Sequence, residues 1–185
     1  MKKAEQPATP AIDKTRIYFV NKDNAPQSEV RIGYMAMPFD ATGEYFKTSL
    51  ANFVLGGAFN SRININLRET KGWTYGARSG FNGTKHIGPY TAAGGIKGEA
   101  TDSSIVEFMK EIKSYADAGI KDDEVAFMKS SIGQQDALKY ETAGQKAGFI
   151  KRILDYNLPK DFVDQQQAII KNITKEDINA LAKKH

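Results

Sequence analysis

The sequence predicts an α+β fold, a two-layer sandwich with helices packed on one face of a mainly antiparallel sheet. Three features carry this prediction: a strand-like alternation at residues 29–37, a hairpin pattern at residues 73–97, and helical periodicity from residue 101 onward. The length of 185 residues and the hydrophobic content of 41% suffice for one sizeable core. We expect one domain at residues 15–185, excised from a larger chain, after a linker or tail at residues 1–14.

The first half of the chain contains the predicted sheet. Residues 16–20 alternate weakly and residues 29–37 alternate clearly, so both segments predict strands. Residues 42–55 and 60–71 carry apolar side chains at three- and four-residue steps, so both predict helices that end at glycines. The two strands within residues 73–97 follow, joined by turn-forming residues. The apolar stripe of the second helix consists of Phe59, Ile63 and Leu67.

The second half of the chain is predicted to be helical. Apolar stripes at helical spacing recur after residue 101, and Gly119 ends the first of them. The last helix begins at Thr174, whose hydroxyl can cap it while Asp177 stands three residues later. The remaining helices are expected from residue 122 onward, at residues 143–156 and at residues 159–171.

The composition excludes several classes of protein. The chain has no cysteine, which excludes disulfides, thiolate catalysis and cysteine-based metal sites. Lys and Arg number 26 against 22 Asp and Glu, and the net charge of +4 is scattered rather than clustered with aromatic residues. A nucleic-acid partner is therefore not expected. No apolar run approaches the roughly 18 residues of a membrane span, so we expect no such span.

Residues that hold metal ions or perform catalysis are scarce. The two histidines, His86 and His185, cannot form the histidine pair on one helix face that H-x-x-E-H and H-E-x-x-H zinc motifs require. The acidic run at residues 122–124 is explained as a helix start that the helix dipole favours. Glycine-rich phosphate loops and the G-x-S-x-G motif are also absent. We assign no catalytic residue, metal ligand or cofactor to this chain.

One segment, residues 55–76, suggests a binding groove. It places two arginines on a short amphipathic helix that leads directly into an aromatic strand. Because a helix end and the start of the next strand are neighbours, Arg68 and Tyr75 can point at a common groove. A guanidinium offers five fixed donors, and a phenol hydroxyl both donates and accepts hydrogen bonds. The alternative is a structural pairing of Arg68 with its neighbour Glu69.

This segment closely resembles the signature of the second, non-catalytic repeat of the pitrilysin/insulinase family of zinc metallopeptidases, L-G-G-x-F-x-S-R-[LI]-x-x-x-L-R-E-x-x-G-x-x-Y-G. The match is long, gapless and rich in glycine, and the resemblance spans roughly residues 15–185. The matching residues are Leu55, Gly56, Gly57, Phe59, Ser61, Arg62, Ile63, Leu67, Arg68, Glu69, Gly72, Tyr75 and Gly76.

The resemblance implies two homologous α+β halves that face each other across a closed chamber. The catalytic half carries H-x-x-E-H and holds zinc, which activates water and polarises the scissile carbonyl. In the non-catalytic half, which this chain resembles, Arg68 would bind substrate carbonyls and Tyr75 would support the oxyanion. The implied partners are a peptide substrate and a homologous catalytic half, in the same parent chain or a partner subunit, with the zinc in that half.

Two other functions remain open from the sequence. A scaffold subunit, similar to the respiratory-chain core proteins of this superfamily, would have no proteolytic role. A basic nucleic-acid module would need a positive groove lined by aromatic residues. Arg68 and Tyr75 favour the peptidase, because a scaffold need not keep a substrate clamp. The cysteine-free composition and the habit of the family favour the bacterial periplasm.

Overall fold

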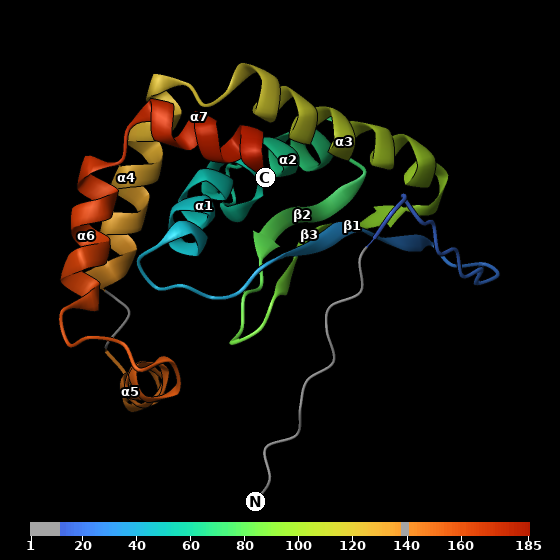
Figure 1. Ribbon diagram of the computed structural model, residues 1–185. Helices are drawn as coiled ribbons and strands as arrows, with labels where there is room; N and C mark the ends of the chain where they lie inside the picture. Colours follow the sequence, from blue (N-terminus) through green and yellow to red (C-terminus); the bar gives the residue numbers. More distant parts are fainter. Residues whose placement is uncertain (1–11, 138–140) are drawn as a thin grey trace, which may run out of the picture.

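A small antiparallel sheet forms one layer of the protein. The computed structural model describes residues 12–137 and 141–185. The sheet has three strands in the order β1-β3-β2, and helices cover one of its faces (Figure 1). The predicted α+β class is therefore confirmed. The strands are β1 (Gln27–Met37), β2 (Thr74–Phe81) and β3 (Gly88–Lys97).

The central strand β3 shows why the sheet is covered on one face only. Its residues alternate between buried and half-buried, as a strand with one face against a core should. Tyr90, Ala92 and Ile96 are among its buried residues and belong to the main core. Helices supply the other side of this core. Their fully buried apolar side chains include Ile63, Leu67, Phe108, Met128 and Ile178.

The two helices predicted in the first half begin as α-helices and end as wider π-helical turns. Ala58 N–H donates to Phe53 O at 2.9 Å, a bond that spans five residues. In the first of these wide turns Gly56 packs against β2, where a Cβ atom would stand 2.1 Å from the Ser79 hydroxyl. The close approach to β2 requires glycine. The elements are α1 (Glu44–Asn52), η1 (Phe53–Gly57), α2 (Arg62–Asn64) and η2 (Ile65–Thr70).

The second half is helical, as predicted. Thr174 and Asp177 form the expected capping box, in which each side chain bonds the backbone N–H of the other residue. The sixth α-helix begins at Phe162, three residues after the predicted start at residue 159. A short turn, η3 (Gly98–Ala100), precedes these helices, which are α3 (Thr101–Ala118), α4 (Asp122–Ala137), α5 (Ala143–Tyr156), α6 (Phe162–Asn172) and α7 (Lys175–Lys184).

The strand predicted at residues 16–20 is wrong. This segment has no regular secondary structure and pairs with no strand in the described part of the chain, and residues 17–20 are 79–90% exposed. A strand needs a neighbour to satisfy its backbone N–H and C=O groups, so apolar alternation alone does not form one. Of the tail predicted at residues 1–14, residues 1–11 lie outside the described residues.

Candidate functional site

Arg68 lies on η2 and stacks on an aromatic ring. Its guanidinium carbon is 4.7 Å from the ring centroid of Phe59, a side chain that is itself 59% exposed. Such a cation–π contact contributes about 0.5–1 kcal/mol at an exposed site and favours the position of the guanidinium over the ring. The stack therefore limits the directions in which the Arg68 donors can point.

The ion pair between Arg68 and Glu69 is present. Arg68 Nη1 donates to Glu69 Oε1 at 2.5 Å, so the structural pairing considered for these residues does form. Both side chains reach solvent, 33% for Arg68 and 59% for Glu69, and exposed pairs of this kind contribute little to stability. Within residues 12–137 and 141–185, no protein partner is recorded for Nε or Nη2 of Arg68. These donors remain available to a ligand.

Tyr75 projects from a β-bulge at the start of β2. Thr74 pairs with Ile96 and Ala77 pairs with Gly94, so β2 advances three residues while β3 advances two. The Thr74 hydroxyl holds the bulge, since it donates to Gly95 O at 2.8 Å and accepts from Gly76 N–H at 3.0 Å. The bulge leaves Tyr75 90% exposed.

The end of η2 is tied to the start of β2, which places Arg68 and Tyr75 on adjoining elements. Gly72 reverses the chain with a φ of +65°, a conformation that favours glycine. Directly after it, Trp73 N–H donates to Leu67 O at 3.0 Å. Both candidate side chains therefore reach solvent from elements that contact each other. That they face one groove stays a prediction.

The sequence prediction did not anticipate the roles of Phe59 and Asn64 around this site. Phe59 was expected on the apolar stripe of a helix, but it lies in the turn before α2 and points its ring outward, whereas Ile63 and Leu67 are fully buried. Asn64 Oδ1 accepts from Ala77 N–H at 2.9 Å. The sequence signal for Phe59 was its position two residues after Gly57, beyond the end of the preceding helix.

The neighbouring Arg62 has a structural role. It donates from Nε to Glu124 Oε1 at 2.7 Å and from Nη2 to Gly119 O at 2.9 Å, which joins α2 to the start of α4. Its guanidinium also lies over the ring of Tyr115. The hydrogen bond to Glu124 raises the pKa of Arg62. The two arginines of the signature thus differ: Arg62 is bonded to Glu124 and Gly119 within the domain, whereas the Arg68 side chain is more exposed and bonds only its neighbour Glu69 in the described chain.

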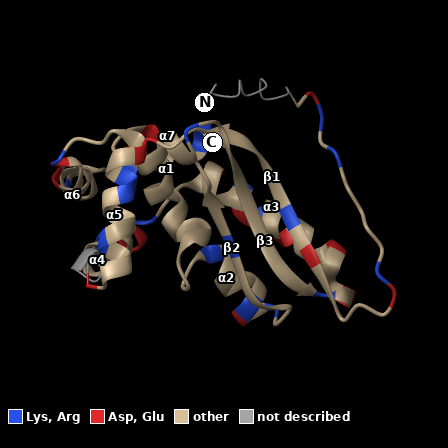
Figure 2. Cartoon of the chain, turned by 90° about the horizontal axis from the view of Figure 1, so that it is seen from below, with Lys and Arg blue, Asp and Glu red and all other residues tan. Residues whose placement is uncertain are grey.

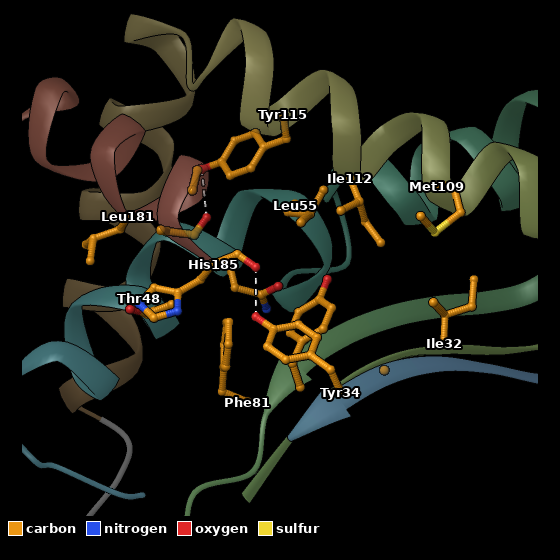
Figure 3. Close-up of a pocket in the computed structure, with 15 residues that line it drawn as sticks. Ile32, Tyr34, Thr48, Leu55, Phe81, Met109, Ile112, Tyr115, Leu181 and His185 are labelled. Carbon is orange, nitrogen blue, oxygen red and sulfur yellow. Dashed lines mark hydrogen bonds between the residues drawn. The ribbon is translucent and has the colours of Figure 1, made fainter. Parts of the chain in front are cut away.

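A cavity of about 160 Å³ lies elsewhere, between the sheet and the helices (Figure 3). Its walls are mainly apolar, and neither Arg68 nor Tyr75 lines it. At one side Tyr34 OH donates to the carbonyl oxygen of His185 at 2.7 Å. On the opposite side Tyr115 OH donates to Ala51 O at 2.8 Å. Because neither Arg68 nor Tyr75 is among its lining residues, the cavity is separate from the candidate site.

Charged residues form no metal site in the described chain. Basic and acidic residues are interspersed along the helices and strands (Figure 2). Among residues 12–137 and 141–185, no group of three or more His, Asp or Glu side chains could hold a metal ion. Zinc therefore does not fit the described part of this chain. No described helix combines the length and apolar character needed to cross a membrane.

We expect Thr74→Val to weaken the bulge that presents Tyr75. The hydroxyl bonds to Gly95 and Gly76 would be lost, and the free energy of unfolding should fall by about 1 kcal/mol. Thr91→Val is the matched control, because Thr91 lies on β3 and no hydrogen bond of its hydroxyl is recorded among the described residues. Urea denaturation of both variants tests this expectation. Equal stability of the Thr74 variant and the wild type would contradict the role of the hydroxyl.

The sequence of this chain is similar to those of known proteins. Residues 2–132, more than half of the chain, match the family model described as the peptidase M16 inactive domain. A curated relative is the non-peptidase homolog YmxG of Helicobacter pylori, 26% identical over 188 residues. The match covers 98% of this chain but 42% of the relative, so the chain spans about two fifths of that protein.

Solved structures share the fold. A peptidase M16 inactive domain from Pseudomonas fluorescens has a TM-score of 0.77 and 22% identity, covering 86% of this chain and 38% of its own. An inactive peptidase domain from Bordetella parapertussis has a TM-score of 0.69 and 11% identity, covering 84% of each chain. At these identities the likeness establishes the architecture of the described domain.

Proposed function

Because this chain belongs to the peptidase M16 inactive-domain family, we propose that it is the non-catalytic, substrate-binding half of a zinc metallopeptidase. A homologous catalytic half, in the same polypeptide or a partner subunit, supplies H-x-x-E-H and zinc. This chain supplies contacts to the peptide backbone. The observation that carries the proposal is a pair of hydrogen-bonding side chains that reach solvent from adjoining elements, the half-buried Arg68 and the exposed Tyr75.

Arg68 is suited to bind peptide carbonyls. The Phe59 ring supports one face of its guanidinium, while Glu69 uses Nη1. Nε and Nη2 can then donate to an extended peptide backbone. Binding in this way costs less side-chain conformational entropy than it would for an unsupported arginine. A hydrogen bond from a charged donor to a neutral carbonyl is stronger than a hydrogen bond between two neutral groups.

Tyr75 is suited to stabilise negative charge that develops on a carbonyl oxygen. Its phenol is 90% exposed on a strand whose bulge is fixed by Thr74, so the side chain is presented from a rigid base. A neutral phenol hydroxyl donates a hydrogen bond, which is worth more to an oxyanion than to a ground-state carbonyl. Tyr75→Phe removes this donor and little of the side-chain volume.

In the complete enzyme, meaning this chain with its catalytic half, Arg68→Ala and Tyr75→Phe should each lower peptide turnover. Loss of one such hydrogen bond corresponds to a decrease of about tenfold in kcat/KM. Zinc content should stay at the wild-type level, because neither residue belongs to a metal site. Elemental analysis and steady-state kinetics measure the two quantities. Unchanged turnover in both variants would remove the proposed roles.

The name of the Helicobacter pylori relative, a non-peptidase homolog, favours a second candidate function. In that case the chain is a scaffold that pairs with a homologous half without proteolysis. The complete protein distinguishes the two functions. Stoichiometric zinc and peptide hydrolysis support the peptidase, whereas a stable assembly that holds no zinc and cleaves no peptide supports the scaffold.

A further inference from the structure

One buried amide connects the two segments that carry the candidate site. The Asn64 side chain, at the end of α2, belongs to a residue that is 3% exposed. Its Nδ2 donates to Phe59 O at 2.7 Å, and its Oδ1 accepts from Ala77 N–H at 2.9 Å. Phe59 supports Arg68, and Ala77 follows the bulge that presents Tyr75.

We propose that Asn64 is a positioning residue that sets the placement of the Phe59–Arg68 stack relative to Tyr75. This inference rests on the proposed function of the site. Asn64 contacts neither Arg68 nor Tyr75 in the described interactions, so it acts through the backbone of Phe59 and Ala77.

Both bonds of Asn64 meet backbone groups that need a partner. Ala77 is fully buried, and a bulge displaces the residues beside it from regular pairing with β3. Phe59 lies in a turn outside any helix or strand, so its carbonyl has no partner from regular secondary structure. An amide supplies one donor and one acceptor at a fixed separation, which suits this bridge.

Asn52, the last residue of α1, provides a matched control because it bonds to the same strand, β2. It is also buried, and its Nδ2 donates to Ser79 O at 2.8 Å while its Oδ1 accepts from the Ser79 hydroxyl at 2.6 Å. It thus ties α1 to β2, two residues beyond Ala77. Asn52 has no recorded contact with Phe59, Arg68 or Tyr75 in the described chain.

The first test is independent of peptide binding. Native-state hydrogen exchange of the 185-residue chain should show faster exchange at the Ala77 amide in Asn64→Ala than in Asn52→Ala, measured at matched overall stability. Unchanged protection at Ala77 would show that the bridge does not hold the strand, and would overturn the inference while leaving the proposed function intact.

The second test measures affinity for a fluorescein-labelled unstructured peptide in the complete enzyme, by anisotropy. Asn64→Ala should raise Kd by about tenfold, and Asn52→Ala should leave it within about twofold. In an Arg68→Ala background, Asn64→Ala should have little further effect on Kd, because Asn64 acts by placing the Phe59 ring that supports Arg68.

The outcomes separate the inference from the function on which it rests. If Arg68→Ala weakens binding but Asn64→Ala does not, Asn64 has no positioning role. If Asn64→Ala weakens binding equally with and without Arg68, its effect is general destabilisation and the inference fails. If Arg68→Ala leaves affinity unchanged, the proposed function and the inference fail together.

Discussion

Arg62→Ala should lower the free energy of unfolding by about 2 kcal/mol, because it leaves Glu124 as a partly buried carboxylate with no charged partner and only the bond from Lys121 N–H. The two side chains are 17% and 19% exposed, so solvent screens their interaction only partly. The substitution also removes the bond to Gly119 O and the cation–π contact with Tyr115. Together with the Glu124 pair, these contacts join α2 to α3 and to the start of α4, so their loss should affect the whole domain.

The ion pair between Arg62 and Glu124 should also make the stability of the fold depend on pH in the acidic range. Burial raises the pKa of Glu124, but hydrogen bonds from Arg62 and from Lys121 N–H outweigh it, and the pKa lies below its ordinary value. A carboxyl with a lowered folded-state pKa stabilises the fold above its unfolded pKa, and this contribution is lost as the pH falls through the folded pKa. The wild type should therefore lose stability below about pH 4.3, and Arg62→Ala should lose less.

Denaturation with guanidinium chloride across this pH range measures both effects. Lys175→Ala is the control, because Lys175 also pairs with the start of α4, through Asp122, but the Asp122 side chain is 87% exposed. Loss of the ion pair between Lys175 and Asp122 should lower the free energy of unfolding by less than about 1 kcal/mol. If Arg62→Ala were no more harmful than Lys175→Ala, the structural role assigned to Arg62 would be incorrect.

Reversing the charge of Arg68 should have the largest effect on peptide turnover. In the complete enzyme, Arg68→Glu should lower kcat/KM by about 100-fold, since a charged donor is lost and a carboxylate then faces peptide carbonyl oxygens. The effect should exceed that of Arg68→Ala, which only removes the donor. Steady-state kinetics with one fluorogenic peptide compares the variants.

Arg68→Lys separates charge from geometry. Lysine keeps the positive charge but lacks the planar fork that stacks on Phe59 and donates in two directions. We expect it to recover part of the activity lost in Arg68→Glu without reaching the wild type. Full activity of Arg68→Glu would exclude any contact between residue 68 and the substrate.

Much of the fold could be predicted from the sequence because its signals are local. The helix α3, the Thr174 capping box and the hairpin depend on residues a few positions apart, and each was confirmed. The family match likewise confirms the resemblance based on residues 55–76. The wide turns η1 and η2 were not predicted, because they depend on packing against β2.

Less of the candidate site than of the fold could be predicted from the sequence. Arg68 and Tyr75 were selected by the motif, and their roles remain predictions. The support given by Phe59 was missed because four-residue spacing assigned its ring to the core. The Asn64 bridge was missed because its second partner, Ala77, is thirteen residues away and lies across a chain reversal. Periodicity cannot indicate a contact of that kind.

The central claim is that this chain binds the peptide although another half supplies the metal. It is tested most directly by the equilibrium affinity of the complete enzyme for a labelled peptide, with zinc removed by a chelator so that no turnover occurs. The Arg68→Ala variant should bind about tenfold more weakly than the wild type, because Arg68 is proposed to contact the carbonyls of the bound peptide before any reaction. Equal affinity of the two proteins would contradict the claim.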